Sequence, residues 1–172
     1  MRDTHRLGTT AIMLVAAVAR ASDGGMEDCP MHAQHMASAV RQEQRAGEEQ
    51  GMKFSQERTT HHFLLAPDGG SIQVTANATD DRTTIEQVRR HLEHIAQAFQ
   101  AGDFATPELV HGETPPGVPA MRRLKTEISY AYQSRSDGAV VVIRSRKPEA
   151  VAAVQEFLRF QIREHRTGDP VR

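Results

Sequence analysis

The sequence predicts an α+β fold: a pseudo-duplicated β-β-α-β-β-α order that gives a four-stranded antiparallel sheet with two long helices on one face. Three observations lead to this class. Two pairs of β-rich segments are each joined by a turn containing Asp-Gly. An amphipathic helical pattern follows each pair. The two helical patterns also share a motif, since V-x-x-H-L-x-H at residues 88–94 matches V-x-x-F-L-x-F at residues 154–160.

Residues 1–21 have the order of a secretory signal peptide. Arg2 and Arg6 precede an uncharged apolar stretch, and Ala-Arg-Ala at residues 19–21 has the small-x-small form of a cleavage site. The apolar stretch is too short to remain as a membrane-spanning helix. We therefore expect an exported chain, periplasmic or secreted, with no membrane span after cleavage. An N-terminal anchor or an unstructured start is the alternative interpretation.

Residues 22–51 contain few apolar side chains and are expected to form a flexible leader and linker that carries His, Met and Cys. The α+β domain is expected to cover residues 52–170. Its first half begins with strands at residues 59–66 and 71–77, which flank the turn sequence Pro-Asp-Gly-Gly. Asp80 and Asp81 then precede a helix at residues 83–101, which Gly102 ends.

The second half of the domain repeats this order. Strands are predicted at residues 126–133 and 139–145, and Pro148 begins a helix that runs to about residue 166. Gly168 and Pro170 are expected to close that helix. Residues 103–125 form a Pro-rich connector between the halves, with a short helix predicted at residues 119–125.

The composition restricts the possible partners of the protein. With 21 Lys+Arg against 22 Asp+Glu, the formal net charge of −1 gives no reason to expect nucleic-acid binding. A single Cys excludes an intrachain disulfide framework. The unusual counts are 9 His and 7 Met in 172 residues. An unpaired cysteine is prone to oxidation in an exported protein, and a metal ion would account for its presence.

A first group of soft and borderline metal ligands lies in the leader. Its predicted ligands are Cys29, Met31, His32, His35 and Met36. Thiolate and thioether groups favour Cu(I), and imidazole serves copper or zinc. Cys-Pro-Met-His at residues 29–32 resembles a short element of heavy-metal-binding domains in copper efflux proteins, although Ala33 stands where that element has proline. The alternative is an unstructured leader whose Met and His residues bind nothing.

A second group of histidines lies in the domain. Its predicted metal ligands are His61, His62, His91, His94 and His111. His91 and His94 lie on consecutive turns of the first long helix, His61 and His62 occupy an apolar strand, and His111 stands in the connector loop. Since successive strand residues face opposite ways, one of the two strand histidines shares the core face. Imidazoles from a strand, a helix and a loop would suit a zinc or copper centre with an open position. The alternatives are hydrogen-bonded core histidines, a subunit interface and a pocket for an organic anion.

Sequence signals for other functional residues or enzyme motifs are weaker. His165 is interpreted as a histidine at a helix C-terminus, where the helix dipole favours it. No P-loop, G-x-G-x-x-G, G-x-S-x-G or H-E-x-x-H motif occurs. If the histidine centre were catalytic, Glu113 would be a better base than Glu93, which points away from His91 on the helix.

The domain resembles a group of small exported bacterial proteins that lack an assigned mechanism and are sometimes named aspartate carbamoyltransferase. The resemblance covers residues 52–170 and lies in THHFLL, PDGG, HLxHIA, AGDF, PPGVP and FLRFQIR. It implies a compact domain and no catalytic residues. True transcarbamoylases resemble this chain poorly, since they are roughly twice as long and carry a Ser-Thr-Arg-Thr loop for carbamoyl phosphate that this sequence lacks.

The sequence therefore favours an exported protein that binds or handles a transition metal, copper before zinc. A small metalloenzyme with a histidine-rich centre is the second hypothesis. A metal-free module that binds a ligand or forms a homodimer is the third.

Overall fold

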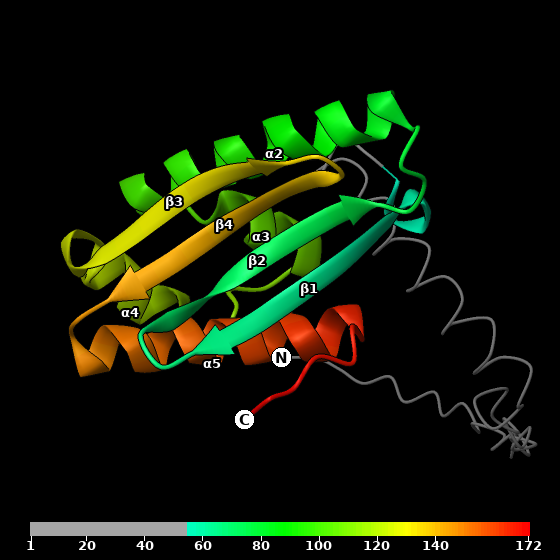
Figure 1. Cartoon of the computed structure of the whole chain (residues 1–172). Helices are drawn as coiled ribbons and strands as arrows, with labels where there is room; N and C mark the ends of the chain where they lie inside the picture. The colour runs from blue at the N-terminus through cyan, green and yellow to red at the C-terminus, as the bar shows by residue number, and fades with distance from the viewer. Residues whose placement is uncertain (1–54) are drawn as a thin grey trace, which may run out of the picture. The chain divides into compact units, whose positions relative to one another are not determined.

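The computed structural model describes residues 55–172, in which a four-stranded antiparallel sheet carries its helices on one face (Figure 1). The predicted α+β class and sheet are thereby confirmed, whereas the internal duplication stays a prediction. The predicted signal peptide, leader and linker lie outside the described residues. The elements in chain order are η2 (Gln56–Arg58), β1 (Thr59–Ala66), β2 (Gly69–Ala76), α2 (Arg82–Ala101), α3 (Ala105–His111), α4 (Val118–Arg123), η3 (Lys125–Glu127), β3 (Ile128–Arg135), β4 (Gly138–Ser145) and α5 (Pro148–His165).

The sheet has the strand order β1-β2-β4-β3, so each hairpin supplies one central and one edge strand. In the first hairpin Ala66 pairs with Gly69, which leaves a two-residue turn and places both glycines of the predicted turn inside β2. The two hairpins meet where β2 pairs with β4. Because successive side chains of a strand point to opposite faces of the sheet, alternate side chains of every strand reach the helix-bearing face.

The core lies between the sheet and the two long helices. α2 packs mainly on β3 and β4, and α5 packs mainly on β1 and β2. Phe99 of α2 and Phe157 of α5 meet edge to face with ring centres 5.8 Å apart, which joins the two helices at the middle of the core. The other large side chains with under 2% exposure include Phe104, Leu92, Met121, Ile143 and Leu158.

The helix ends follow local sequence signals. The Asp81 carboxylate accepts a 3.2 Å hydrogen bond from the backbone N–H of Thr84 and caps α2 at its start. Gly102 ends α2 in the left-handed conformation with φ 83°. α5 differs from the prediction at its end, because Arg166 rather than Gly168 is the left-handed C-cap, with φ 51°.

The connector is more helical than predicted. The prediction of a connector at residues 103–125 did not include α3, whose first turn contains Pro107; a proline is tolerated in the first turn of a helix. His111 is consequently the last residue of α3 and not a loop residue. At α4, a Cβ on Gly117 would lie 2.2 Å from the carbonyl oxygen of Ala153, so this glycine allows the connector to contact α5 closely.

Within residues 55–172, we find no helix with the length and apolar character needed to cross a membrane.

Candidate functional site

Four histidines from four elements line one small cavity between the sheet and the helices. They are His61 of β1, His91 of α2, His111 of α3 and His165 of α5. The cavity has a volume of about 60 Å³. That is less than half of the roughly 150 Å³ of an apolar cavity that holds benzene. The remaining lining residues are Phe63, Ile72, Val74, Leu92, Ile95, Phe99, Thr106, Pro107, Val110, Phe157 and Gln161.

Local periodicity brings the histidines to this cavity. His61 lies on the same strand face as Phe63, because side chains two residues apart in a strand point the same way. On α5, Phe157, Gln161 and His165 recur every four residues and therefore stack along one helix face. Each of the four histidines is only partly buried, whereas most of the apolar lining is fully buried. The histidines are thus more exposed to solvent than the apolar part of the cavity wall.

The imidazole rings of His61 and His111 both lie close to that of His165. The ring centres of His61 and His165 are 5.7 Å apart, and those of His111 and His165 are 5.3 Å apart. Two imidazoles on one metal ion have ring centres roughly 5–6.5 Å apart, given metal–nitrogen bonds of about 2.0–2.1 Å. Within residues 55–172, however, no three His, Cys, Asp or Glu side chains are arranged as a group that could hold a metal ion. Three-ligand binding would therefore require some imidazoles to rotate.

Burial keeps two of these imidazoles neutral. The pKa of His61 is lowered from 6.5 to about 4, first by burial and then by repulsion from His62. The pKa of His165 is lowered from 6.5 to about 3, first by burial and then by repulsion from His61 and His111. Both shifts follow from the cost of a positive charge in an apolar site. At neutral pH these rings therefore offer a nitrogen lone pair in place of a second N–H.

Gln161 is a polar member of the cavity wall that sequence reasoning missed. Its side-chain oxygen Oε1 accepts a 3.0 Å hydrogen bond from Nε2 of His111, so Nε2 of that imidazole carries the proton. In the neutral form of this imidazole, Nδ1 is then the nitrogen with the lone pair. The amide nitrogen Nε2 of Gln161 is buried and has no hydrogen-bond partner in the described part of the chain.

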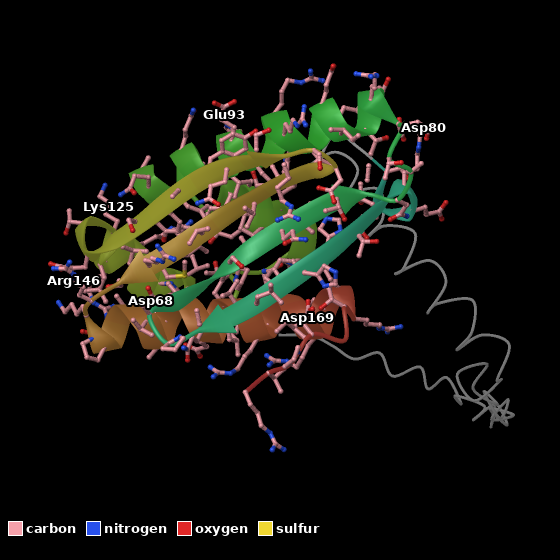
Figure 2. The ribbon with its side chains drawn as sticks, viewed as in Figure 1. Asp68, Asp80, Glu93, Lys125, Arg146 and Asp169 are labelled. Carbon is pink, nitrogen blue, oxygen red and sulfur yellow. The ribbon has the colours of Figure 1, made fainter. Side chains whose placement is uncertain are left out.

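His62 has a different environment from His61, its neighbour in the chain. Its Nδ1 lies 2.8 Å from Oδ1 of Asp169, and Oδ2 of the same carboxylate accepts a 2.8 Å hydrogen bond from the backbone N–H of Phe63. Thr167 donates a further 2.6 Å hydrogen bond to Oδ2. Figure 2 shows Asp169 in the C-terminal segment beside α5. We call this contact the C-terminal clasp, and it ties the segment after α5 to the free edge of β1.

The remaining predicted site residues do not line the cavity. His94 is exposed on α2. Glu113, the predicted base, is exposed in the loop after α3. Figure 2 shows Glu93 projecting outward from α2, as expected from its position on the helix. The leader ligands Cys29, Met31, His32, His35 and Met36 lie outside the described residues.

His165 was interpreted from sequence as a helix-terminal histidine, and its place in the cavity was missed. A signal was present, because its spacing of four from Gln161 and of eight from Phe157 puts it on the apolar face of α5. No comparable signal distinguished His61 from His62, since either register of β1 was compatible with the sequence.

No family model, curated protein or solved structure matches this chain.

Proposed function

We propose that the protein is an exported transition-metal-binding protein that handles copper before zinc, with the histidine cavity as its binding site in the domain. One observation carries the proposal: His61, His91, His111 and His165, from four elements far apart in the chain, line one small cavity. Chance placement of histidines on exposed surfaces would not bring four of them to the wall of one cavity.

The chemistry of the cavity supports a borderline metal ion. Neutral imidazole is a ligand for copper and zinc, and the low pKa values of His61 and His165 keep both rings neutral at physiological pH. Among divalent ions copper binds nitrogen ligands most tightly, which is the reason for placing copper before zinc. Gln161 would orient His111 as second-sphere carbonyl groups orient metal-bound histidines.

The leader complements the cavity in this proposal. Cys29, Met31 and Met36 supply soft sulfur ligands that favour Cu(I). The cavity supplies nitrogen ligands and no sulfur in the described part of the chain. The leader would therefore capture soft ions, and the cavity would hold a second, imidazole-bound ion.

A metalloenzyme receives less support than metal binding. General-base chemistry needs a proton acceptor within reach of the activated water. No carboxylate of residues 55–172 lines the cavity, and Glu113 is exposed. The alternative is a metal-free module that binds a ligand or forms a homodimer. Measuring whether the chain binds a metal ion distinguishes this alternative from the proposal.

Metal titration of the untagged chain under reducing conditions tests the proposal. The leader is silenced by the substitutions Cys29→Ser, Met31→Leu, His32→Gln, His35→Gln and Met36→Leu. We expect the leader-silenced chain to bind about one equivalent of copper and to bind zinc more weakly. Adding His91→Gln and His165→Gln should weaken copper binding more than about 100-fold.

His94→Gln is the matched control, because His94 lies on the same helix as His91 but outside the cavity. It should leave the copper affinity of the leader-silenced chain unchanged. If that chain retains neither copper nor zinc, the cavity is not a metal site and the metal-free module takes its place. Equal losses of copper affinity for the His94→Gln chain and for the chain with His91→Gln and His165→Gln would also contradict the proposal.

A further inference from the structure

The edge strand β3 has backbone groups that no described strand pairs with. Among the described strands, β3 pairs with β4 alone. The Gln100 side chain bonds to the carbonyl oxygen of Ile128 and to the N–H of Tyr130, so these groups point away from β4. Because backbone groups alternate in direction along an antiparallel strand, the N–H and C=O groups of Tyr132 and Ser134 point away from β4 as well. Such a free edge can pair with another chain.

Gln100 shows how an added strand would meet this edge. Its amide presents one acceptor and one donor to β3, as a peptide group of a neighbouring strand does. A strand that lies beyond Gln100 along β3 would reach the backbone groups of Tyr132 and Ser134 in the same way. The other edge of the sheet differs, because the C-terminal clasp occupies the N–H of Phe63 in β1.

An open groove lies beside this free edge, between α2 and β3. Its volume is about 520 Å³, which is within the roughly 300–1,000 Å³ of ligand sites in proteins. Its wall includes Glu93 and Gln97 of α2 and Tyr130 and Tyr132 of β3. Figure 1 shows α2 running along β3. Since alternate side chains of a strand point to one face, a strand added beside β3 would direct every second side chain toward this groove.

The charge of the groove indicates which side chain fits it. Glu93 is the charged member of the described groove wall, and it forms no ion pair within residues 55–172. Its carboxylate is exposed, and the Tyr132 ring is partly exposed. A carboxylate and an aromatic ring in one groove favour a cationic side chain, through an ion pair and a cation–π contact.

The same charge argues against a second copy of β3 as the added strand. The β3 side chains on the helix-bearing face are Ile128, Tyr130, Tyr132 and Ser134, and none of them is basic. A second β3 strand would therefore bring no cation to Glu93. A basic segment of a different protein complements the groove better.

We propose that β3 binds an extended segment of a partner protein as a fifth strand, with a Lys or Arg of that segment placed in the groove at Glu93. Hydrogen bonds to the backbone of Tyr132 and Ser134 supply affinity, and the groove supplies the preference for a basic side chain. No groove residue also lines the histidine cavity. The interaction therefore goes beyond the proposed metal binding and does not depend on it.

Selection from a display library of random seven-residue peptides on the full chain tests this inference. Enriched peptides should contain β-branched residues and a Lys or Arg at one fixed position. For a synthetic copy of the most enriched peptide, Glu93→Lys should raise the dissociation constant about tenfold, because an attraction becomes a repulsion. Replacing the basic residue of the peptide by Glu should restore binding to the Glu93→Lys chain.

Glu86→Lys is the matched control, because Glu86 is exposed on the same helix but lies outside the groove wall. It should leave the dissociation constant of the peptide unchanged. A library that yields no enriched peptide would overturn the inference. Peptides whose binding weakens equally with Glu93→Lys and Glu86→Lys would overturn it too.

Two further measurements examine the backbone pairing. In ¹H–¹⁵N spectra the amides of Tyr132 and Ser134 should shift when the enriched peptide is added, whereas that of Phe63 on the other edge should not. N-methylation of alternate peptide bonds in the peptide should abolish binding, because it removes the donors that an added strand needs. Binding that survives N-methylation in both alternate patterns would contradict the added strand. A dimer of the unmodified chain that protects the Tyr132 and Ser134 amides from hydrogen exchange would assign the edge to a second copy and overturn the inference.

Discussion

The buried imidazoles of His61 and His165 give the metal-free domain a specific sensitivity to acid. Each ring has a pKa below that of a free histidine because burial disfavours its charged form. In the unfolded chain these rings take up protons near pH 6.5, whereas in the folded domain they do so only near pH 4 for His61 and near pH 3 for His165. Between these values the unfolded state binds more protons than the folded state. Acid therefore favours unfolding in that interval.

We expect the free energy of unfolding of the metal-free chain to fall as pH decreases from 6.5 to about 4. The limiting slope is about 1.4 kcal/mol per pH unit for each of the two histidines. Urea unfolding at several pH values measures it. His61→Gln combined with His165→Gln should flatten this dependence, and His94→Gln should leave it intact. An unchanged slope in the double variant would contradict the account.

The histidines also show what residue-level sequence reasoning can and cannot supply. Period-two alternation predicts that only one of His61 and His62 faces the core, and the structure selects His61. The choice depends on the register of β1 against β2, where His61 pairs with Val74. The sequence did not predict the role of Gln161, because a single amide on an apolar helix face does not indicate which side chain it bonds to, here His111.

At the scale of elements, both edge strands are held by a side chain from a helix or from the segment after one. Gln100 of α2 donates to the backbone oxygen of Ile128 at 3.2 Å and accepts from the N–H of Tyr130 at 3.3 Å, along the edge of β3. The C-terminal clasp does the same for β1 through Asp169. These contacts occupy backbone groups that an edge strand otherwise leaves open.

Asp169→Ala should lower the free energy of unfolding by roughly 1–3 kcal/mol, because it leaves the N–H of Phe63 without its acceptor. The side chain of Asp169 is only 7% exposed, so water replaces the carboxylate poorly. Asp80→Ala, in the exposed turn before α2, is the control and should change stability little. Chemical denaturation at pH 7 measures both variants, and equal stabilities would show that the clasp does not hold the edge.

The elements themselves were largely predictable, since hairpin turns and helical periodicity are local signals. α3 was missed because residues 103–125 were predicted as a Pro-rich connector, although the first turn of a helix accepts proline, as Pro107 does in α3. Gly112, with φ 68°, marks the end of α3 and was an available signal for it. The contact of α4 with α5 at Gly117 depends on packing between distant segments, and no local pattern encodes it.

At the scale of the whole molecule, the cavity lies where the sheet and three helices each contribute one histidine. The contact between the rings of His61 and His165 joins the first strand to the last helix of the described domain. Composition indicated that soft and borderline ligands were enriched, but only the fold shows which of them meet. The central claim is that these four imidazoles hold a metal ion.

The most direct test is a crystal structure of the copper-loaded full chain with anomalous diffraction recorded at the copper absorption edge. The account predicts an anomalous peak in the cavity, about 2.0–2.1 Å from a ring nitrogen of at least two of His61, His91, His111 and His165. A fully copper-loaded crystal whose only copper peaks lie at the leader or on the surface, with the four imidazoles unligated, would contradict it.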